Sequence, residues 1–472
     1  MEFSWKFVLD AGIISAALLL ATFLRTKWRF LQRFMVPNSL TAGFILLPVY
    51  NYLMPALGYG ANKLGDLVYH LLNISFIAMA LRSRPKKVQG DKSHSIWAMS
   101  TAILNQYAIQ AIVGLLLTWM LASTIFPRIN LAFGLHLPLG FALGPGQAYA
   151  IGIGWEKMGF EGAGSAGLTM AALGYLWACL VGVALVNFGV RKGLLPKDTL
   201  DSMKDKAMLS GIVPRDREKA VGSKNTTDLE AIDPLSLHAA LIAFTYIISY
   251  VLLLGLTWLL SFAGKTGNEL ARNLWGINFI FSAVVAMLLR TIIDKLKIDH
   301  VVDDGSLSRL AGFSVDFMVT AALAAISLVF VGKYWLPILV VSTIGGIVIT
   351  ITVPWLCSRM FSDHTYLRMI MIFGVSTGTL STGLALLRIL DPEFKTRVSS
   401  DYMLSSGLTF ALAIPFILAI NLPAQVAVQG TMNPFWIFML IAGGYLVYTM
   451  VVFVILSKSR AFKNPLKCWL GD

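Results

Sequence analysis

Charged side chains are scarce in this chain. Only 13% of its 472 residues are charged, whereas 57% are hydrophobic; a soluble domain has about 25% charged residues. Apolar stretches of about 20 residues, long enough for an α-helix to cross hydrocarbon, recur from end to end. No soluble core could bury so many of them, and the composition therefore predicts an all-α polytopic membrane protein.

Motifs of metal sites, disulfide scaffolds and nucleotide binding are also missing. The three cysteines lie too far apart in sequence for a metal spacing or a disulfide framework. There is no Walker A motif and no H-E-x-x-H, and the G-x-G-x-x-G match at 162–167 lacks the strand and βαβ unit that it needs. We therefore expect no enzyme. The net charge of +13 is typical of basic cytoplasmic loops, and we expect no nucleic-acid partner.

Eleven apolar stretches are predicted to span the membrane, and two more are broken near their middle. The predicted spans are 4–24, 36–57, 64–81, 97–126, 164–190, 235–262, 273–293, 309–331, 334–358, 403–422 and 433–456. Glycine and polar residues interrupt the segments 134–155 and 368–390. We interpret these two as re-entrant hairpins, within about 134–160 and 366–395.

The distribution of basic residues supports this topology. With the N-terminus outside and both broken segments re-entrant, all but seven of the 38 Lys and Arg residues fall in cytoplasmic loops or in the C-terminal tail. This is the bias of the positive-inside rule. If the first broken segment spanned instead, most of the later basic residues would lie outside. The sequence predicts a membrane protein with its N-terminus outside and its C-terminus in the cytoplasm.

The order of elements predicts two inverted repeats. Four spans, a broken segment and a fifth span form the first repeat, 1–190, and the same order recurs in 234–424 after a cytoplasmic linker at 191–233. Five spans is an odd number, so the second repeat runs inverted. In the ungapped alignment of the two broken segments Gly146 meets Gly378. Residues 425–472 have no counterpart and are predicted to form an extra transmembrane helix with a cytoplasmic tail.

The two broken segments are the predicted substrate site. Irregular backbone at membrane depth occurs where it lines a cavity or is buried in protein, and its helix ends offer positive dipoles and carbonyl groups to ligands. The candidate residues in the first segment are Gly144, Gly146, Gln147 and Tyr149. Those in the second are Ser376, Thr377, Gly378, Thr379, Ser381, Thr382 and Arg388, whose guanidinium matches the geometry of a carboxylate.

Two polar residues inside predicted spans are candidate sodium ligands. Asp316 lies about two turns into its span, where an ionisable group costs roughly 2.5–3.5 kcal/mol and normally faces a cavity or a partner. Its counterpart in the first repeat is Asn73. Carboxylate and amide oxygens both suit hard cations such as Na⁺, and the alternative role for Asp316 is that of a proton carrier.

Several segments are similar to the bacterial sodium/glutamate symporter family. They are VPNSLTAGFILLP at 36–48, GFALGPGQAYAIG at 140–152, AGLTMAALGYLWACLVG at 166–182 and GVSTGTLSTGLALLRILDP at 374–392. The resemblance implies two inverted five-helix repeats with re-entrant hairpins, a homodimer, an elevator-type motion and Na⁺-coupled glutamate uptake in a bacterial inner membrane. Both hairpins depart from the family pattern: Gly146 matches, Gln147 replaces a histidine, and the second hairpin matches at Gly374 and at Thr382 and Ala385.

The sequence therefore favours a Na⁺-coupled carrier of a small carboxylate or amino acid, with lipid as its surroundings. One alternative is an H⁺-coupled or exchange-type organic anion carrier, in which Asp316 carries the proton. An ion channel is a further alternative. Against a channel, the sequence lacks repeated selectivity-filter motifs, and two inverted hairpins suit alternating access.

Overall fold

The chain is helical throughout the part that the structure describes. A computed structural model describes residues 6–34, 36–57, 62–83, 92–194, 210–215, 221–228, 230–262, 278–391 and 396–470, together with 264, 267, 268, 271, 274 and 275. No strand occurs among these residues. Much of the predicted linker at 191–233 and the loop at 84–91 lie outside them.

The helices follow the predicted order. Those of the first half are α1 (Lys6–Lys27), α2 (Arg29–Arg33), α3 (Asn38–Pro48), η1 (Val49–Leu53), α4 (Met54–Ala56), α5 (Asn62–Ala80), α6 (Lys92–Thr124), η2 (Leu131–Leu135), η3 (Pro138–Leu143), α7 (Pro145–Glu156) and α8 (Ala163–Arg191). The rest are α11 (Pro234–Ser261), α13 (Asn278–Lys295), η4 (Asp299–Val301), α14 (Asp304–Ala324), α15 (Leu328–Lys333), α16 (Trp335–Met360), α17 (Thr365–Leu390), α18 (Val398–Ala419), η5 (Pro423–Gln425), α19 (Val426–Gln429), α20 (Asn433–Ser457) and η6 (Lys458–Arg460).

Eight helices in the described residues are long and apolar enough to cross a membrane, which confirms an integral membrane protein. They overlap eight of the eleven predicted spans. The described parts of the predicted spans 36–57, 64–81 and 273–293 are mainly helical but fall short of that measure. The first is divided among α3, η1 and α4, and the other two are α5 and α13, which carry more polar residues. The buried polar residues Asn73 of α5 and Arg290 of α13 face other helices.

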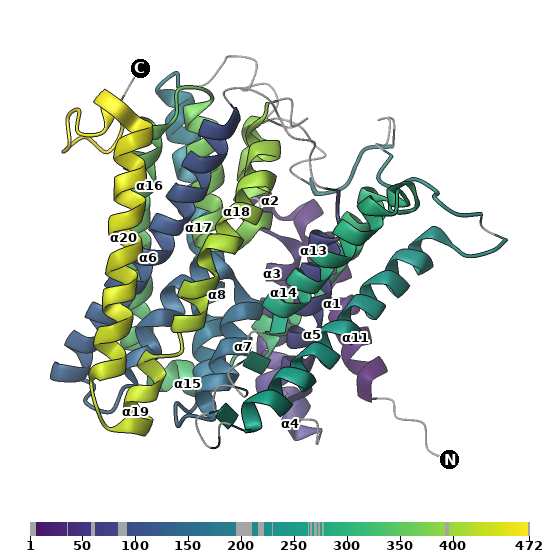
Figure 1. Cartoon of the computed structure of the whole chain (residues 1–472), viewed down its shortest axis with the longest axis horizontal. Helices are drawn as coiled ribbons and strands as arrows, with labels where there is room; N and C mark the ends of the chain where they lie inside the picture. The colour runs from purple at the N-terminus through teal and green to yellow at the C-terminus, as the bar shows by residue number, and fades with distance from the viewer. Residues whose placement is uncertain are drawn as a thin grey trace.

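The helices form two bundles, which lie side by side in Figure 1. One bundle consists of α1, α3, α5, α11, α13 and α14, and we call it the first bundle. The second bundle consists of α6, η2, η3, α7, α8, α16, α17, α18 and α20. The main contact between the bundles is made by α7, which packs against α5 and α14. Each bundle therefore draws helices from both halves of the sequence.

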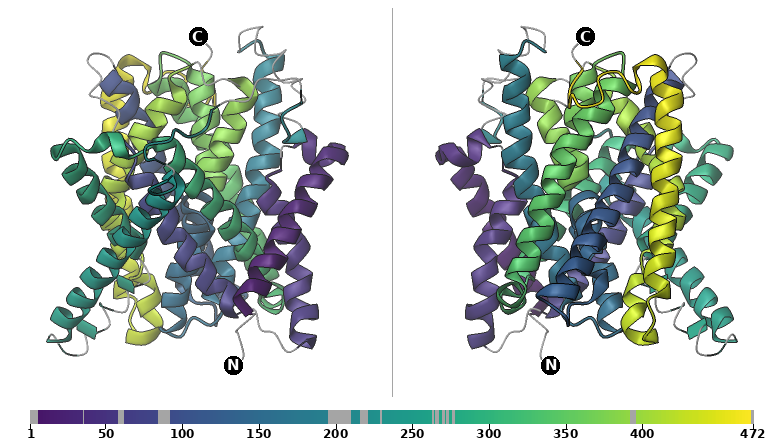
Figure 2. Two further views of the ribbon diagram at one scale, coloured as in Figure 1. Left: turned by 90° about the vertical axis from the view of Figure 1, so that its right-hand side faces the viewer. Right: turned by 90° about the vertical axis from the view of Figure 1, so that its left-hand side faces the viewer.

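In the first bundle, the second helix of each half packs in parallel on the third helix of the other half. On α13 and α5, the Ser282 hydroxyl donates to Asn73 Oδ1 at 2.8 Å, and Arg290 donates to the carbonyl of Leu81 at 3.3 Å, with the same sequence offset. On α3 and α14, the Thr320 hydroxyl donates to the carbonyl of Ser39 at 3.2 Å. Figure 2 shows the matching outer helices, α1 with α3 and α11, at opposite edges of this bundle.

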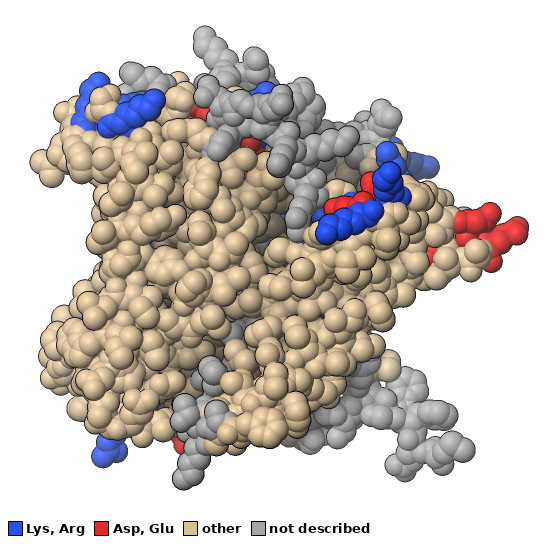
Figure 3. Space-filling model, in the orientation of Figure 1, with Lys and Arg blue, Asp and Glu red and all other residues tan. Residues whose placement is uncertain are grey.

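Charge is distributed in bands along the molecule. On the face shown in Figure 3, most Lys and Arg side chains gather toward the end where the C-terminus lies, and the wide middle band has none. The N-terminal end of α1 lies at the opposite end of the helices (Figure 1). An apolar middle band between charged ends is the surface that a bilayer requires.

Candidate functional site

The backbone breaks once in each of the two interrupted segments, and both breaks have the same conformation. Gly144, between η3 and α7, has φ 97° and ψ 173°. Thr379, inside α17, has φ 80° and ψ 178°. Glycine adopts this region freely, whereas a threonine in it costs of order 1–3 kcal/mol and persists only where its surroundings enforce it. The structure thus pairs Gly144 with Thr379. This register is shifted by three residues from the ungapped sequence alignment, which paired Gly146 with Gly378.

At each break the chain turns back along itself. The His136 and Trp155 rings, on either side of Gly144, have centroids 5.0 Å apart. In α17, the Thr382 hydroxyl donates to the carbonyl of Gly374 at 3.1 Å, eight residues earlier. A straight helix would separate Thr382 from Gly374 by about 12 Å. The two arms of each segment therefore lie side by side.

The two breaks face each other in the core of the second bundle. A Cβ atom at Gly144 would lie 2.5 Å from Cγ2 of Thr379. Helix α8 supports both segments: a Cβ at its Gly174 would lie 2.4 Å from the carbonyl oxygen of Thr377 and 2.9 Å from the Phe141 ring. The Tyr175 hydroxyl lies 3.3 Å from Oγ1 of Thr379. The absence of a side chain at Gly174 therefore allows both interrupted segments to pack closely on α8.

Each break leaves a helix N-terminus at the point where Gly144 and Thr379 meet, which we call the junction. Helix α7 begins at Pro145, whose missing N–H suits the first helical position, and the second arm of α17 begins directly after Thr379. Free N–H groups and the helix dipole make such ends favourable for anions. The carbonyl ends of the preceding arms lie at the same junction. Within the described residues, no cluster of three His, Cys, Asp or Glu side chains could hold a metal, so a cation here would depend on carbonyl, hydroxyl and amide oxygens.

Buried polar atoms without a protein partner surround the junction. They are Oε1 of Gln147, Oε1 of Gln110 on α6 and Oγ of Ser376. Gln110 also donates from Nε2 to the carbonyl of Ser376 at 3.1 Å, so these two residues are neighbours. Unsatisfied buried polar atoms cost about 1–3 kcal/mol each, so these atoms require water or another polar group as a partner.

The remaining predicted residues divide between the junction and its surroundings. Gly146 lies where α7 meets the first bundle, because its Cβ would lie 2.7 Å from Leu72 and 2.8 Å from Met318. The Tyr149 ring lies against Gly65 and Gly164, away from the break. Thr377 and Thr382 donate to backbone carbonyls within α17, and a Cβ at Gly378 would meet the Thr382 hydroxyl. The side chain of Ser381 lies outside the described part of the structure.

Arg388 lies apart from the junction. It is exposed, nine residues after Thr379 in the second arm of α17. At the rise of an α-helix, nine residues correspond to roughly 13 Å. The structure therefore brings Arg388 to the base of the arm rather than to the tip.

Asn73 and Asp316 take corresponding places in the first bundle, on different faces. Asn73 is fully buried and accepts from Ser282 of α13, whereas Asp316 is exposed and interacts with the Ser39 hydroxyl of α3. Asp316 precedes Met318 by two residues, which is about 200° around α14 from the side chain that contacts Gly146. Both residues lie in the bundle that faces the junction, and their contacts with Ser282 and Ser39 are made within that bundle.

The sequence did not point to several residues at the junction and at the first turns of α17 and α18. Gln106 and Gln110 are spaced as one face of α6, and this i, i+4 pair of amides in an apolar helix was the available signal. Tyr175 carried no signal beyond its place in a small-residue helix. Arg368 and Asp401, which form a buried ion pair, are ionisable residues inside apolar runs, and the rule applied to Asp316 covers them equally.

Comparison with family models decides the assignment, because the model described as sodium/glutamate symporter matches residues 8–384. The chain belongs to the sodium/glutamate symporter family. The match runs from α1 to the second arm of α17 and includes both breaks; α18, α20 and the C-terminal tail lie beyond it. No curated protein and no solved structure matches this chain. Membership confirms the predicted resemblance and implies sodium-coupled symport, with Na⁺ as coupling ion and a small substrate such as glutamate.

Proposed function

We propose that this member of the sodium/glutamate symporter family transports a small carboxylate or amino acid together with Na⁺. The observation that carries the proposal is the meeting of the two breaks, Gly144 and Thr379, among unpartnered buried polar atoms. The N-terminus of α7 and that of the second arm of α17 suit a substrate carboxylate. The amide and hydroxyl oxygens of Gln147, Gln110 and Ser376 suit an ammonium group or Na⁺.

The transport mechanism that we propose is an elevator motion of the second bundle against the first. Both interrupted segments lie in the second bundle, as two re-entrant hairpins of an inverted repeat. The parallel pairing of α13 on α5 and of α3 on α14 supports that repeat. Gly146 touches Leu72 and Met318 of the first bundle directly beside the break. Because this contact lies beside the break, movement of the second bundle along the first would change which side of the membrane the junction opens to.

Flux in proteoliposomes tests the proposed function. An inward Na⁺ gradient is expected to drive saturable accumulation of glutamate or another small carboxylate against its concentration gradient, and equal Na⁺ on both sides is expected to abolish accumulation. A ligand that binds the folded state alone raises apparent stability, so a thermal-shift screen of amino acids and carboxylates with and without Na⁺ identifies the substrate first. Accumulation driven by a pH gradient without Na⁺ would favour the H⁺-coupled alternative, and downhill conductance a channel.

Asp316→Asn is expected to weaken sodium coupling. A Na⁺ site at Asp316, separate from the junction, would lose one charged ligand worth about 1.5–3 kcal/mol. The Na⁺ concentration for half-maximal uptake would then rise about tenfold or more, with the substrate KM at saturating Na⁺ little changed. Asp66→Asn, on α5, is the matched control for removing a carboxylate from the same bundle. Unaltered Na⁺ dependence in Asp316→Asn would remove this residue, and with it the predicted Asn73 and Asp316 site, from the coupling mechanism.

Gln147→Leu is expected to stabilise the ligand-free protein while it impairs uptake. Leucine has a similar volume and removes a buried oxygen that has no partner, so the melting temperature in detergent should stay equal or rise. The binding site also loses this oxygen as a partner for the substrate, so the substrate KM should rise about tenfold. Gln429→Leu, at an exposed glutamine, controls for the change of residue type. A lower melting temperature with unchanged KM would mean that Gln147 supports the fold alone.

We also propose the cellular arrangement that the charge distribution favours. The end with the C-terminus and most basic side chains would face the cytoplasm of a bacterium, with the N-terminus outside. The homodimer implied by the resemblance remains a prediction, which size-exclusion chromatography with light scattering checks directly.

A further inference from the structure

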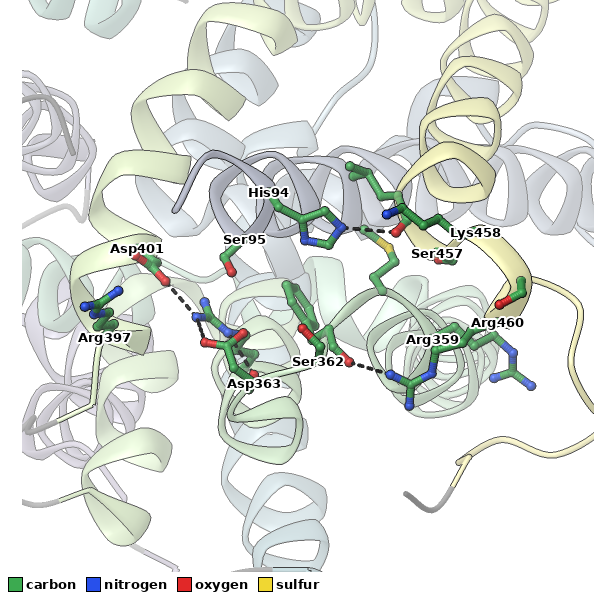
Figure 4. Close-up of a pocket in the computed structure, with 15 residues that line it drawn as sticks. His94, Ser95, Arg359, Ser362, Asp363, Arg397, Asp401, Ser457, Lys458 and Arg460 are labelled. Carbon is green, nitrogen blue, oxygen red and sulfur yellow. Dashed lines mark hydrogen bonds and ion pairs between the residues drawn. The ribbon is translucent and has the colours of Figure 1, made fainter. Parts of the chain in front are cut away.

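A cavity of about 510 Å³ lies at the end of the second bundle where the chain's C-terminus is found, away from the helix breaks. Five elements meet there: the first turns of α6, α17 and α18 and the last turns of α16 and α20. Figure 4 shows Arg397 beside Asp401 on one side of this cavity, and Lys458 and Arg460 on the other. We call it the basic cavity. Its volume is in the range of small-ligand sites.

Cations outnumber carboxylates in the lining. Arg359, Arg368, Arg397, Lys458 and Arg460 stand against Asp363 and Asp401. The two carboxylates are already engaged, because Nη2 of Arg368 lies 2.7 Å from Oδ2 of each. The other four cations have no ion pair with a described residue. The basic cavity therefore has an uncompensated positive charge.

Arg359 shows that this charge is built into the fold. Its side chain is 1% exposed, and its Nε has no partner in the structure. Nη2 donates to the carbonyls of Asn464 at 2.9 Å and Lys467 at 3.0 Å. These partners are neutral, so they satisfy the hydrogen bonds of the guanidinium without cancelling its charge. The tail residues that Arg359 holds thus supply no counter-ion.

The same tail has the composition of a membrane-surface segment. Phe462 is 63% exposed and Leu466 is 99% exposed, and they alternate with the exposed Lys463 and Lys467. Apolar side chains that enter the headgroup region beside basic residues are typical of interfacial segments. The basic cavity therefore lies at the depth of the lipid headgroups, where anionic lipids attract Lys and Arg.

We propose that the basic cavity binds a phosphate-bearing anion, which is supplied either by an anionic lipid headgroup or by free phosphate. The ligand's negative charge would compensate Arg397, Lys458 and Arg460 from the two sides of the cavity, and so would tie α18 to the end of α20. This site is independent of the transported substrate and of the hairpin junction. It would stabilise the bundle in anionic membranes.

The test uses the purified full-length chain in detergent, with melting temperature as the readout. Phosphatidylglycerol is compared with phosphatidylcholine of identical acyl chains, and inorganic phosphate is compared with chloride at equal ionic strength. Stabilisation by phosphatidylglycerol alone assigns the site to lipid, and stabilisation by inorganic phosphate as well assigns it to the phosphate group itself. Equal effects of both lipids together with no effect of phosphate would overturn the proposal.

Paired variants locate the binding. Arg397→Gln with Lys458→Gln removes two exposed cations and is expected to weaken the apparent affinity for phosphatidylglycerol roughly 30-fold. Arg128→Gln with Lys157→Gln removes two cations at the opposite end of the helices and should leave that affinity unchanged. Both proteins are first compared without lipid, where their melting temperatures should match the parent chain. An equal loss of affinity in the two variants would mean non-specific attraction and would contradict a site in the cavity.

Discussion

Gly144→Ala is expected to reduce Na⁺-driven uptake about 100-fold. The new Cβ would lie 2.5 Å from Cγ2 of Thr379, so one of the two facing segments must move. The φ of 97° at this residue also disfavours any L side chain. A displacement of about 1 Å in a binding constellation can cost roughly 100-fold in rate. Initial uptake rates in proteoliposomes, at equal protein incorporation, measure the effect.

The chain offers both a control and a rescue for this variant. Gly154 lies in the same helix α7 with nothing within 4 Å of its Cβ position, so Gly154→Ala should transport as the parent does. Thr379→Ser can remove the methyl group that clashes, and Gly144→Ala with Thr379→Ser should recover part of the lost rate. Full activity of Gly144→Ala would mean that the breaks do not face each other in the transporting protein.

The location of the breaks could be predicted from the sequence because the chemistry there is local. Gly144 and Pro145 end one helix and begin the next, and the polar residues from Ser376 to Thr379 interrupt an apolar helix. The register between the two segments could not be predicted. It depends on which residue takes the unusual conformation, and in the second segment this is Thr379 although Gly378 is adjacent. Neighbouring structure, rather than residue preference, decides that position.

The partners of the polar residues also required tertiary structure. Asn73 meets Ser282, which is more than 200 residues away, because two helices from different halves pack in parallel. Periodicity within one helix contains no information on that pairing. The inverted order of elements did place Asn73 and Asp316 at corresponding positions, and each meets a serine of the other half's second helix. The correspondence of these two positions was thus more accessible from the sequence than the contacts that each residue makes.

Arg368→Met is expected to lower the free energy of unfolding by about 3–5 kcal/mol. Arg368 is fully buried at the base of α17, and its Nη2 lies 2.7 Å from Oδ2 of Asp401 on α18. Removing one partner of a buried ion pair leaves the other charge without compensation, and this is the costly change rather than loss of the pair itself. Unfolding in mixed detergent and sodium dodecyl sulfate micelles gives the free-energy difference.

The two carboxylates around Arg368 should differ in their importance. Partial burial disfavours ionisation of Asp363, but the hydrogen bond and charge of Arg368 outweigh it and hold the pKa of this carboxyl below its usual value. Its side chain is nevertheless 48% exposed, so water screens the interaction, and Asp363→Asn should cost less than about 1 kcal/mol. A depressed pKa stabilises the fold above the ordinary carboxyl range, and that small contribution should be lost as the pH falls through the lowered pKa.

The double variant separates buried charge from lost packing. In Arg368→Met with Asp401→Leu no charge of this pair remains buried, and apolar replacement of a buried ion pair is often neutral. The double variant should therefore recover most of the stability that Arg368→Met loses, which is a coupling of about 2 kcal/mol or more in the double-mutant cycle. If the two losses simply added, Arg368 would act through packing against Phe361 and Met99, and the ion pair would not be what fixes the first turn of α17.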